Sequence, residues 1–176
     1  MIRRAFGTAA IVLCTAIASQ SAAAQDGFKP GYMDIGPTLG FGNLGHASTA
    51  FGARFEKGIK ELPSMGNGVL GIQVGLNYYS WNYFSANSKF IVISGTANYH
   101  FKLDDKKWDP FIGLGLAYSS ISCSYPGSGV DYCEGSALDL AARGGVRYFF
   151  SPSMSGYADV GAGGATLNLG VMFKLQ

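Results

Sequence analysis

Charged side chains in this 176-residue chain fall at positions that alternate with apolar residues. Eight of them share this pattern: Asp34, Arg54, Glu56, Asp139, Arg143, Arg147, Asp159 and Lys174. Alternate residues of a β-strand point to one face, so we expect these side chains to share the interior of one sheet structure. With His100 and Lys102 near one mouth, four acids nearly balance five Lys and Arg bases. Enclosed charges survive only when paired, so the set predicts a structural network of ion pairs or a gated polar conduit.

Eight segments carry the alternation that would position these charges. They span residues 32–42, 48–58, 69–83, 90–103, 110–123, 136–150, 154–162 and 165–175. In the fourth, Ile91 and Ile93 begin an apolar set at odd positions, whereas Ser94 and Thr96 begin a polar set at even positions. The connecting segments are rich in Gly, Pro, Asn and Asp, the residues of turns. The pattern predicts an all-β domain of eight antiparallel strands joined by hairpins.

The first 24 residues have the features of a cleaved secretory signal peptide. Arg3 and Arg4 precede the apolar run AAIVLCTAIA, and Ala22-Ala23-Ala24 offers a small-residue cleavage site. The run is shorter than the roughly 20 residues that a spanning helix needs. We therefore expect an exported chain, with residues 1–24 removed and residues 25–176 forming one domain.

Export places two cysteines, Cys123 and Cys133, in an oxidising compartment, where such a pair is expected to form a disulfide. Antiparallel strands pair residues whose numbers have a constant sum. Facing cysteines would therefore place Gly113 opposite Arg143 and Phe111 opposite Gly145. The first pairing would leave room for a guanidinium, and the second would cover a strand glycine with an aromatic ring.

The overall composition argues against nucleic-acid binding and against an ordinary soluble surface. Without Arg3 and Arg4, the 13 Lys and Arg become 11 and equal the 11 Asp and Glu, so no basic surplus remains. Charged residues make up 14% of the chain, against roughly 25% in typical soluble domains.

The two faces of the predicted strands decide between a lipocalin-like soluble barrel and a membrane barrel. A soluble barrel would show many Lys and Glu on its outside. Here the non-apolar face consists largely of Gly, Ser, Ala, Asn and Thr, which suit a narrow interior. Aromatic residues such as Tyr99, Phe101, Tyr148 and Phe150 lie toward strand ends, where interfacial girdles occur. The pattern predicts that the apolar face points outward into lipid.

The last strand and two hairpins resemble a known family. Residues 168–175, NLGVMFKL, are similar to the terminal signal by which outer-membrane barrels are recognised for assembly, with Asn168, Gly170, Phe173 and Leu175 in the signal positions. The stretches DPFIGLGLAY and ARGGVRYFFSPSMSGYADVG resemble the later hairpins of the small outer-membrane β-barrel domain, the OmpA-like and OmpX-like, porin-type superfamily. The resemblance implies an eight-stranded antiparallel up-and-down transmembrane β-barrel in the bacterial outer membrane, with its N-terminus and short turns in the periplasm. It also implies outer-membrane lipid and the barrel-assembly machinery as partners.

Three functions follow as expectations from this resemblance and from the interior charges. The first is a structural or surface-interaction role, with a polar lumen plugged by ion pairs and an unknown surface ligand. The second is a narrow porin-like channel. The third is a lipid-modifying enzyme, because lipid A deacylases are also small barrels with a His/Ser pair, and His46 and Ser48 form the sequence's His-x-Ser. That pair precedes the second strand and has no evident carboxylate partner, so no catalytic, cofactor or metal site is assigned.

Overall fold

The computed structural model describes residues 27–83, 86–124 and 135–175. Its strands are β1 (Met33–Phe41), β2 (Ala50–Leu62), β3 (Gly68–Tyr83), β4 (Ala86–His100), β5 (Trp108–Ser124), β6 (Gly135–Ser151), β7 (Met154–Ala162) and β8 (Leu167–Lys174). A short 3-10 turn, η2 (Pro63–Met65), joins β2 to β3. Each strand coincides with a predicted segment to within a few residues. Within the described ranges, no helix is long and apolar enough to cross a membrane.

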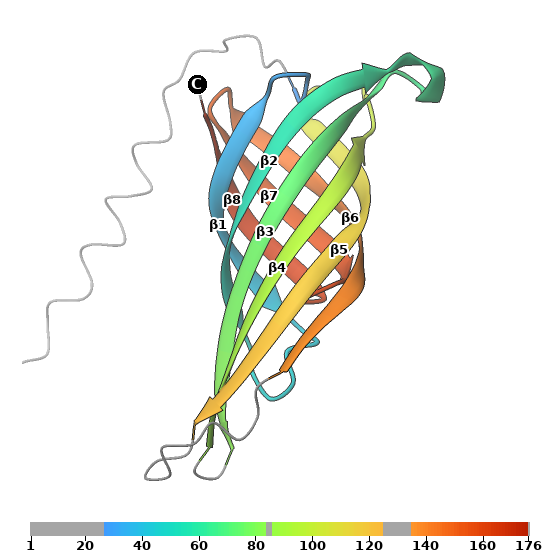
Figure 1. Ribbon diagram of the computed structural model, residues 1–176. Helices are drawn as coiled ribbons and strands as arrows, with labels where there is room; N and C mark the ends of the chain where they lie inside the picture. The colour runs from blue at the N-terminus through green and yellow to red at the C-terminus, as the bar shows by residue number, and fades with distance from the viewer. Residues whose placement is uncertain (1–26, 84–85, 125–134, 176) are drawn as a thin grey trace, which may run out of the picture.

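The eight strands form a closed barrel in which each strand is antiparallel to its neighbours in sequence. β8 returns to β1, with Leu39 opposite Leu169 and Ile35 opposite Phe173. Figure 1 shows the strands inclined around one axis. We call the end of the barrel where β1 begins and β8 ends the terminal end, and the opposite end the loop end. The predicted eight-stranded antiparallel up-and-down barrel is confirmed.

The barrel wall is apolar on its outside and polar within. Leu114 is 71% exposed and Leu140 is 80% exposed, whereas Asp34 and Glu56 are completely buried. Near the terminal end, the outward rings of Trp108 and Tyr148 lie 4.6 Å apart, at a place suited to an interfacial girdle. An exposed apolar surface of this extent is typical of a wall that faces lipid. The predicted outward direction of the apolar face is confirmed.

Four neighbouring strands project beyond the others at the loop end, as Figure 1 shows. β3 to β6 have 15 to 17 residues each, whereas β1 and β7 have nine and β8 has eight. The pairing between β6 and β7 stops at Ala142 and Ala162, so residues 135–140 of β6 lie past the closed part of the barrel. Ala141 is buried because the loop after β7 covers it. The inner face of the projecting strands is therefore not enclosed on all sides.

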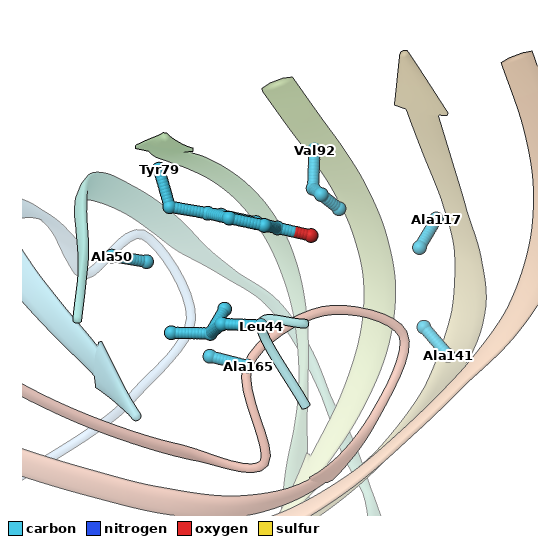
Figure 2. Packing of buried hydrophobic residues seen from close by; sticks show 7 residues of the cluster. All are labelled: Leu44, Ala50, Tyr79, Val92, Ala117, Ala141 and Ala165. Carbon is cyan, nitrogen blue, oxygen red and sulfur yellow. The ribbon is translucent and has the colours of Figure 1, made fainter. Parts of the chain in front are cut away.

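An apolar cluster fills the loop-end part of the interior (Figure 2). It consists of Leu44, Ala50, Tyr79, Val92, Ala117, Ala141 and Ala165. Leu44 comes from the loop between β1 and β2, and Ala165 comes from the loop between β7 and β8. The second loop passes so close to β6 that a Cβ on Gly163 would lie 2.7 Å from Ala141 Cα. Gly163 also has a φ of +88°, so both space and backbone conformation require glycine there.

The register between β5 and β6 agrees with the pairing predicted from the cysteines. Gly113 lies opposite Arg143, and Phe111 lies opposite Gly145. The Phe111 ring covers Gly145, since a Cβ there would lie 2.7 Å from the ring. The space above Gly113 is occupied by the Asn98 amide rather than by a guanidinium. Cys123 is 3% exposed near the end of β5. Cys133 lies outside the described residues, so the disulfide stays a prediction.

The disulfide can be tested by counting reactive thiols in the mature protein. Denaturation without reductant should expose no reactive cysteine, and denaturation with reductant should expose two. Replacing both Cys123 and Cys133 with Ser should lower the free energy of unfolding by about 3 kcal/mol, because the closed loop restrains the unfolded hairpin. As a control, Cys123→Ser alone should expose one thiol without reductant. Two reactive thiols in unreduced wild-type protein would contradict the prediction.

Candidate functional site: the charged interior of the barrel

The guanidinium of Arg147 on β6 is the centre of the interior charge network. It is completely buried and meets carboxylates from three other strands. Nη2 lies 2.6 Å from Glu56 Oε2 on β2, and Nη1 lies 3.1 Å from Asp109 Oδ2 on β5. Nε lies 3.2 Å from Asp34 Oδ2 on β1, an ion pair without hydrogen-bond alignment. One cation thus holds three acids that would repel one another without it.

Glu56 joins the central cation to further strands. Its Oε2 also accepts a hydrogen bond of 2.6 Å from Arg54 Nη2. Its Oε1 accepts one of 2.6 Å from Asn98 Nδ2 and lies 2.9 Å from His100 Nε2. Because this carboxylate is buried, each contact replaces solvation that water would otherwise provide.

His100 on β4 bridges two of the acids. Nδ1 lies 2.9 Å from Asp109 Oδ1, and Nε2 lies 2.9 Å from Glu56 Oε1. An ionised carboxylate only accepts hydrogen bonds, so when Asp109 and Glu56 are both ionised both ring nitrogens donate and the ring is an imidazolium. The interior cations Arg54, Arg143, Arg147 and His100 then balance the anions Asp34, Glu56, Asp109 and Asp159.

A second layer of ion pairs lies nearer the loop end. Arg143 Nε donates a hydrogen bond of 2.8 Å to Asp159 Oδ1, and Arg143 Nη2 contacts the same oxygen. Nη2 also donates to the carbonyl of Ala165 at 3.0 Å. Asn168 Nδ2 donates to Asp159 Oδ1 at 2.9 Å. This layer links β6, β7, β8 and the loop between the last two strands.

Aromatic rings pack against the central cations. The Arg54 guanidinium lies 3.5 Å from the centroid of the Tyr157 ring. Phe28, which precedes β1, stacks on His100 at 3.7 Å and lies 4.9 Å from the Arg147 guanidinium. Cations placed over ring faces gain attraction that strengthens on desolvation. Phe28 therefore closes the terminal side of the network.

A small cavity of about 20 Å³ separates the two layers. Arg54, Asn77 and Arg143 are among its lining residues. Arg54 Nε and Nη1 and the Asn77 side-chain oxygen are buried atoms without a hydrogen-bond partner in the protein. A cavity needs roughly 10–15 Å³ for one water, so this space suits a single water bonded to those atoms.

The structure brings together six of the eight predicted interior charges: Asp34, Arg54, Glu56, Arg143, Arg147 and Asp159. The prediction is wrong for the other two. Asp139 is exposed because it lies on β6 beyond the last pair with β7. Lys174 is exposed at the terminal mouth, where its Nζ lies 5.9 Å from the Tyr32 ring centroid. Both residues have the parity of the inner face. Asp139 lies past the enclosed part of the barrel, whereas Lys174 is paired with the buried Asp34 but has an exposed side chain.

Sequence reasoning missed two kinds of participant. Asp109 contacts both Arg147 and His100, yet it falls one residue before the predicted start of its strand. Asp109 is two residues from Phe111 and therefore shares its face of the strand, which is the sequence feature that indicates an inward side chain. The neutral amides were also missed, although Gln73 Oε1 accepts a hydrogen bond of 2.7 Å from Asn98. His100 was expected near the mouth but lies inside, with 2% of its surface exposed.

The other sequence-predicted residues lie away from this network. His46 and Ser48 are exposed in the loop between β1 and β2, and the His46 ring is 6.0 Å from the Trp81 ring, edge to face. Asn168 on β8 is buried on the inner face, which Gly170 shares. Phe173 on β8 and Leu175 just after it are exposed on the outside. In the described part of the chain, no three His, Cys, Asp or Glu side chains are placed to hold a metal ion.

Comparison with known proteins gives a family and a fold. The family model of the outer membrane protein beta-barrel domain matches residues 10–173. No curated protein sequence matches the chain. Ail, the attachment invasion locus protein of Yersinia pestis, has 12% identity and a TM-score of 0.53, covering 81% of this chain and 93% of Ail. Ail with the heparin analogue sucrose octasulfate has 13% identity, a TM-score of 0.54 and the same coverage. A de novo designed transmembrane β-barrel has 15% identity and a TM-score of 0.52, covering 84% and 98%.

The network can be tested with one interior carboxylate and one exposed carboxylate. Glu56→Gln keeps the side-chain shape but removes the charge shared by two guanidiniums and the imidazolium. Breaking a buried ion pair costs about 3–5 kcal/mol, so we expect a loss of that size in the free energy of unfolding. Asp139→Asn is the matched control and should change it by less than about 0.5 kcal/mol. Reversible urea titrations in detergent micelles measure both. Equal losses of stability in the two variants would contradict the placement of Glu56 inside the enclosed barrel and of Asp139 outside it.

Proposed function

The chain belongs to the outer membrane protein β-barrel domain family, and from this we propose that it serves the bacterial outer membrane as a structural or surface-interaction protein. In this proposal the lumen is plugged by its own side chains and does not act as an open pore. The protein is not an enzyme, and its wall is embedded in outer-membrane lipid after insertion by the barrel-assembly machinery.

The proposal rests on one observation: charged and amide side chains form a connected network that crosses the barrel interior. Arg147 alone reaches from β6 to β1, β2 and β5. Phe28 lies over this layer, and the apolar cluster around Leu44 and Tyr79 occupies the loop-end part of the lumen. An ion entering the barrel would have to displace paired, desolvated charges at a cost of several kcal/mol.

The surface-interaction part of the proposal rests on the loop end. The projecting portions of β3 and β4 carry the stacked rings of Trp81 and Phe90, whose centroids lie 4.5 Å apart. These rings pack on the apolar cluster and stay partly exposed. Aromatic residues held rigidly outside a membrane wall offer contact area at little entropic cost. Ail, which shares the fold, is named as an attachment protein and has been crystallised with a heparin analogue. We infer a comparable role in contact with other surfaces.

A narrow channel is the second candidate, and the cavity between the two charge layers is the observation that favours it. With a volume of about 20 Å³ and a polar lining, this cavity could form one part of a water-filled path through the barrel. The paired layers on both sides of the cavity argue for low conduction.

Localisation tests the membrane part of the proposal. The mature chain should be recovered in the outer-membrane fraction and should migrate differently on a gel before and after heating, because a closed barrel resists unfolding in detergent. Glu56→Gln, which removes a central charge, should shift from the folded to the unfolded band at a lower temperature than Asp139→Asn. Recovery of the wild type as a soluble periplasmic protein would refute the proposal.

Conductance in planar bilayers tests the plugged lumen against the channel. Wild-type monomer should pass little current, with steps well below those of an open porin. Replacing Arg147 with Ala should raise leakage, because a buried guanidinium and its contacts to three strands are lost. Asp139→Asn, outside the enclosed interior, should leave the current unchanged. Large, stable steps from the wild type would favour the channel.

A further inference from the structure

A pocket of about 310 Å³ opens at the terminal end of the barrel. It lies between the mouth of the lumen and the outer rim of the wall, and it is separate from the cavity between the charge layers. Three lysines line it: Lys29 before β1, and Lys102 and Lys106 in the turn between β4 and β5. His100 lies buried at its floor, with its two ring nitrogens held by Asp109 and Glu56.

Three lysines and two carboxylates line the pocket, while Asp104 and Asp105 of the same turn do not line it. Asp109 also lines the pocket, but it is already shared between Arg147 and His100. Glu61 is the other lining carboxylate. Within the described residues, neither Lys102 nor Lys106 forms an ion pair, and both side chains are exposed. The pocket therefore offers two ammonium groups to an anion.

The outer rim of the pocket is apolar and continuous with the lipid-facing wall. Phe101, Leu103 and Trp108 line the pocket and are 42%, 46% and 47% exposed, respectively. These side chains lie where interfacial aromatic residues meet lipid head groups and the first acyl carbons. A ligand with an anionic head and apolar chains would match both halves of this surface.

We propose that this pocket binds the phosphate-bearing head group of an anionic glycerophospholipid from the membrane leaflet at the terminal end. The phosphate contacts Lys102 and Lys106, the glycerol portion enters the pocket, and the acyl chains lie along Leu103 and Trp108. The volume of about 310 Å³ is at the lower end of the roughly 300–1,000 Å³ of ligand pockets, which suits a head group whose chains stay outside. The inference rests on the proposed membrane location.

Trp108 provides a local probe of the bound lipid. The chain has two tryptophans, so Trp81→Phe leaves Trp108 as the single fluorophore and keeps a ring at the loop end. The variant is placed in phosphatidylcholine bilayers that contain a small fraction of lipid with brominated acyl chains. Brominated phosphatidylglycerol should quench Trp108 more strongly than brominated phosphatidylcholine at the same fraction. Each lysine near an anionic lipid contributes about 1 kcal/mol, equivalent to about fivefold in relative association constant.

Charge-matched variants separate the pocket from the overall charge. In the Trp81→Phe background, Lys102→Gln with Lys106→Gln should abolish the preference for phosphatidylglycerol. Lys89→Gln with Lys107→Gln removes the same charge and should retain it, because Lys89 lies at the other end of β4 and Lys107 does not line the pocket. The proposal would be overturned if both double variants lost the preference for phosphatidylglycerol equally, or if the Trp81→Phe parent showed no such preference.

Soluble glycerol phosphate tests whether the head group alone is the ligand. At millimolar concentration it should not relieve the quenching, because it lacks the acyl chains that contact Leu103 and Trp108. Full relief would overturn the assignment to a lipid and identify a free phosphate ester as the ligand. A parent protein that fails to insert into bilayers would instead refute the membrane location, so the two failures are distinguishable.

Discussion

The contacts of one buried guanidinium, that of Arg147, determine how the rest of the barrel interior is arranged. Eight strands enclose a space just wide enough for side chains, so a cation there must find its partners in the protein. Asp34, Glu56 and Asp109 supply them from three strands. Each of these acids would be costly to bury alone, so the cation and the acids depend on one another. The barrel closes where β8 pairs with β1, and Arg147 on β6 and Asp34 on β1 lie on opposite sides of that pairing. Their contact therefore helps to fix the closed register.

The composition of the inner face follows from this arrangement. Long charged side chains can cross a narrow lumen only where their neighbours are small. The glycine at 71 leaves room for Glu56 and His100, since a Cβ there would lie 3.1 Å from each side chain. Glycine at 113 likewise admits the Asn98 amide. Apart from the apolar clusters inside, most large apolar side chains are on the outside, where lipid replaces a protein core as their apolar environment.

The strands, their inward and outward faces and the β5–β6 register could be predicted from the sequence, because each depends on a local period of two. The exact membership of the interior could not. Asp139 and Arg143 share parity on β6, yet only Arg143 is enclosed, because β7 is too short to cover the start of β6. Asp109 is enclosed although it adjoins a turn. The odd or even position of a residue in its strand tells which face its side chain is on. Whether that side chain is enclosed depends on the lengths of other strands, which the local pattern does not give. Leu44 entered the interior from a loop, where no periodicity exists to reveal it.

The terminal end and the loop end of the barrel differ in the groups that a ligand could contact. Asp109 belongs to two environments at once, since it pairs with Arg147 inside the lumen and lines the pocket at the terminal end. The floor of that pocket is therefore built from the same side chains that cross the interior. A head group bound there would approach the paired cations His100 and Arg147 without a route past them, because Phe28 stacks on His100 at the boundary. In the proposed arrangement, lipid contact belongs to the terminal end, and recognition of other surfaces belongs to the projecting strands at the loop end.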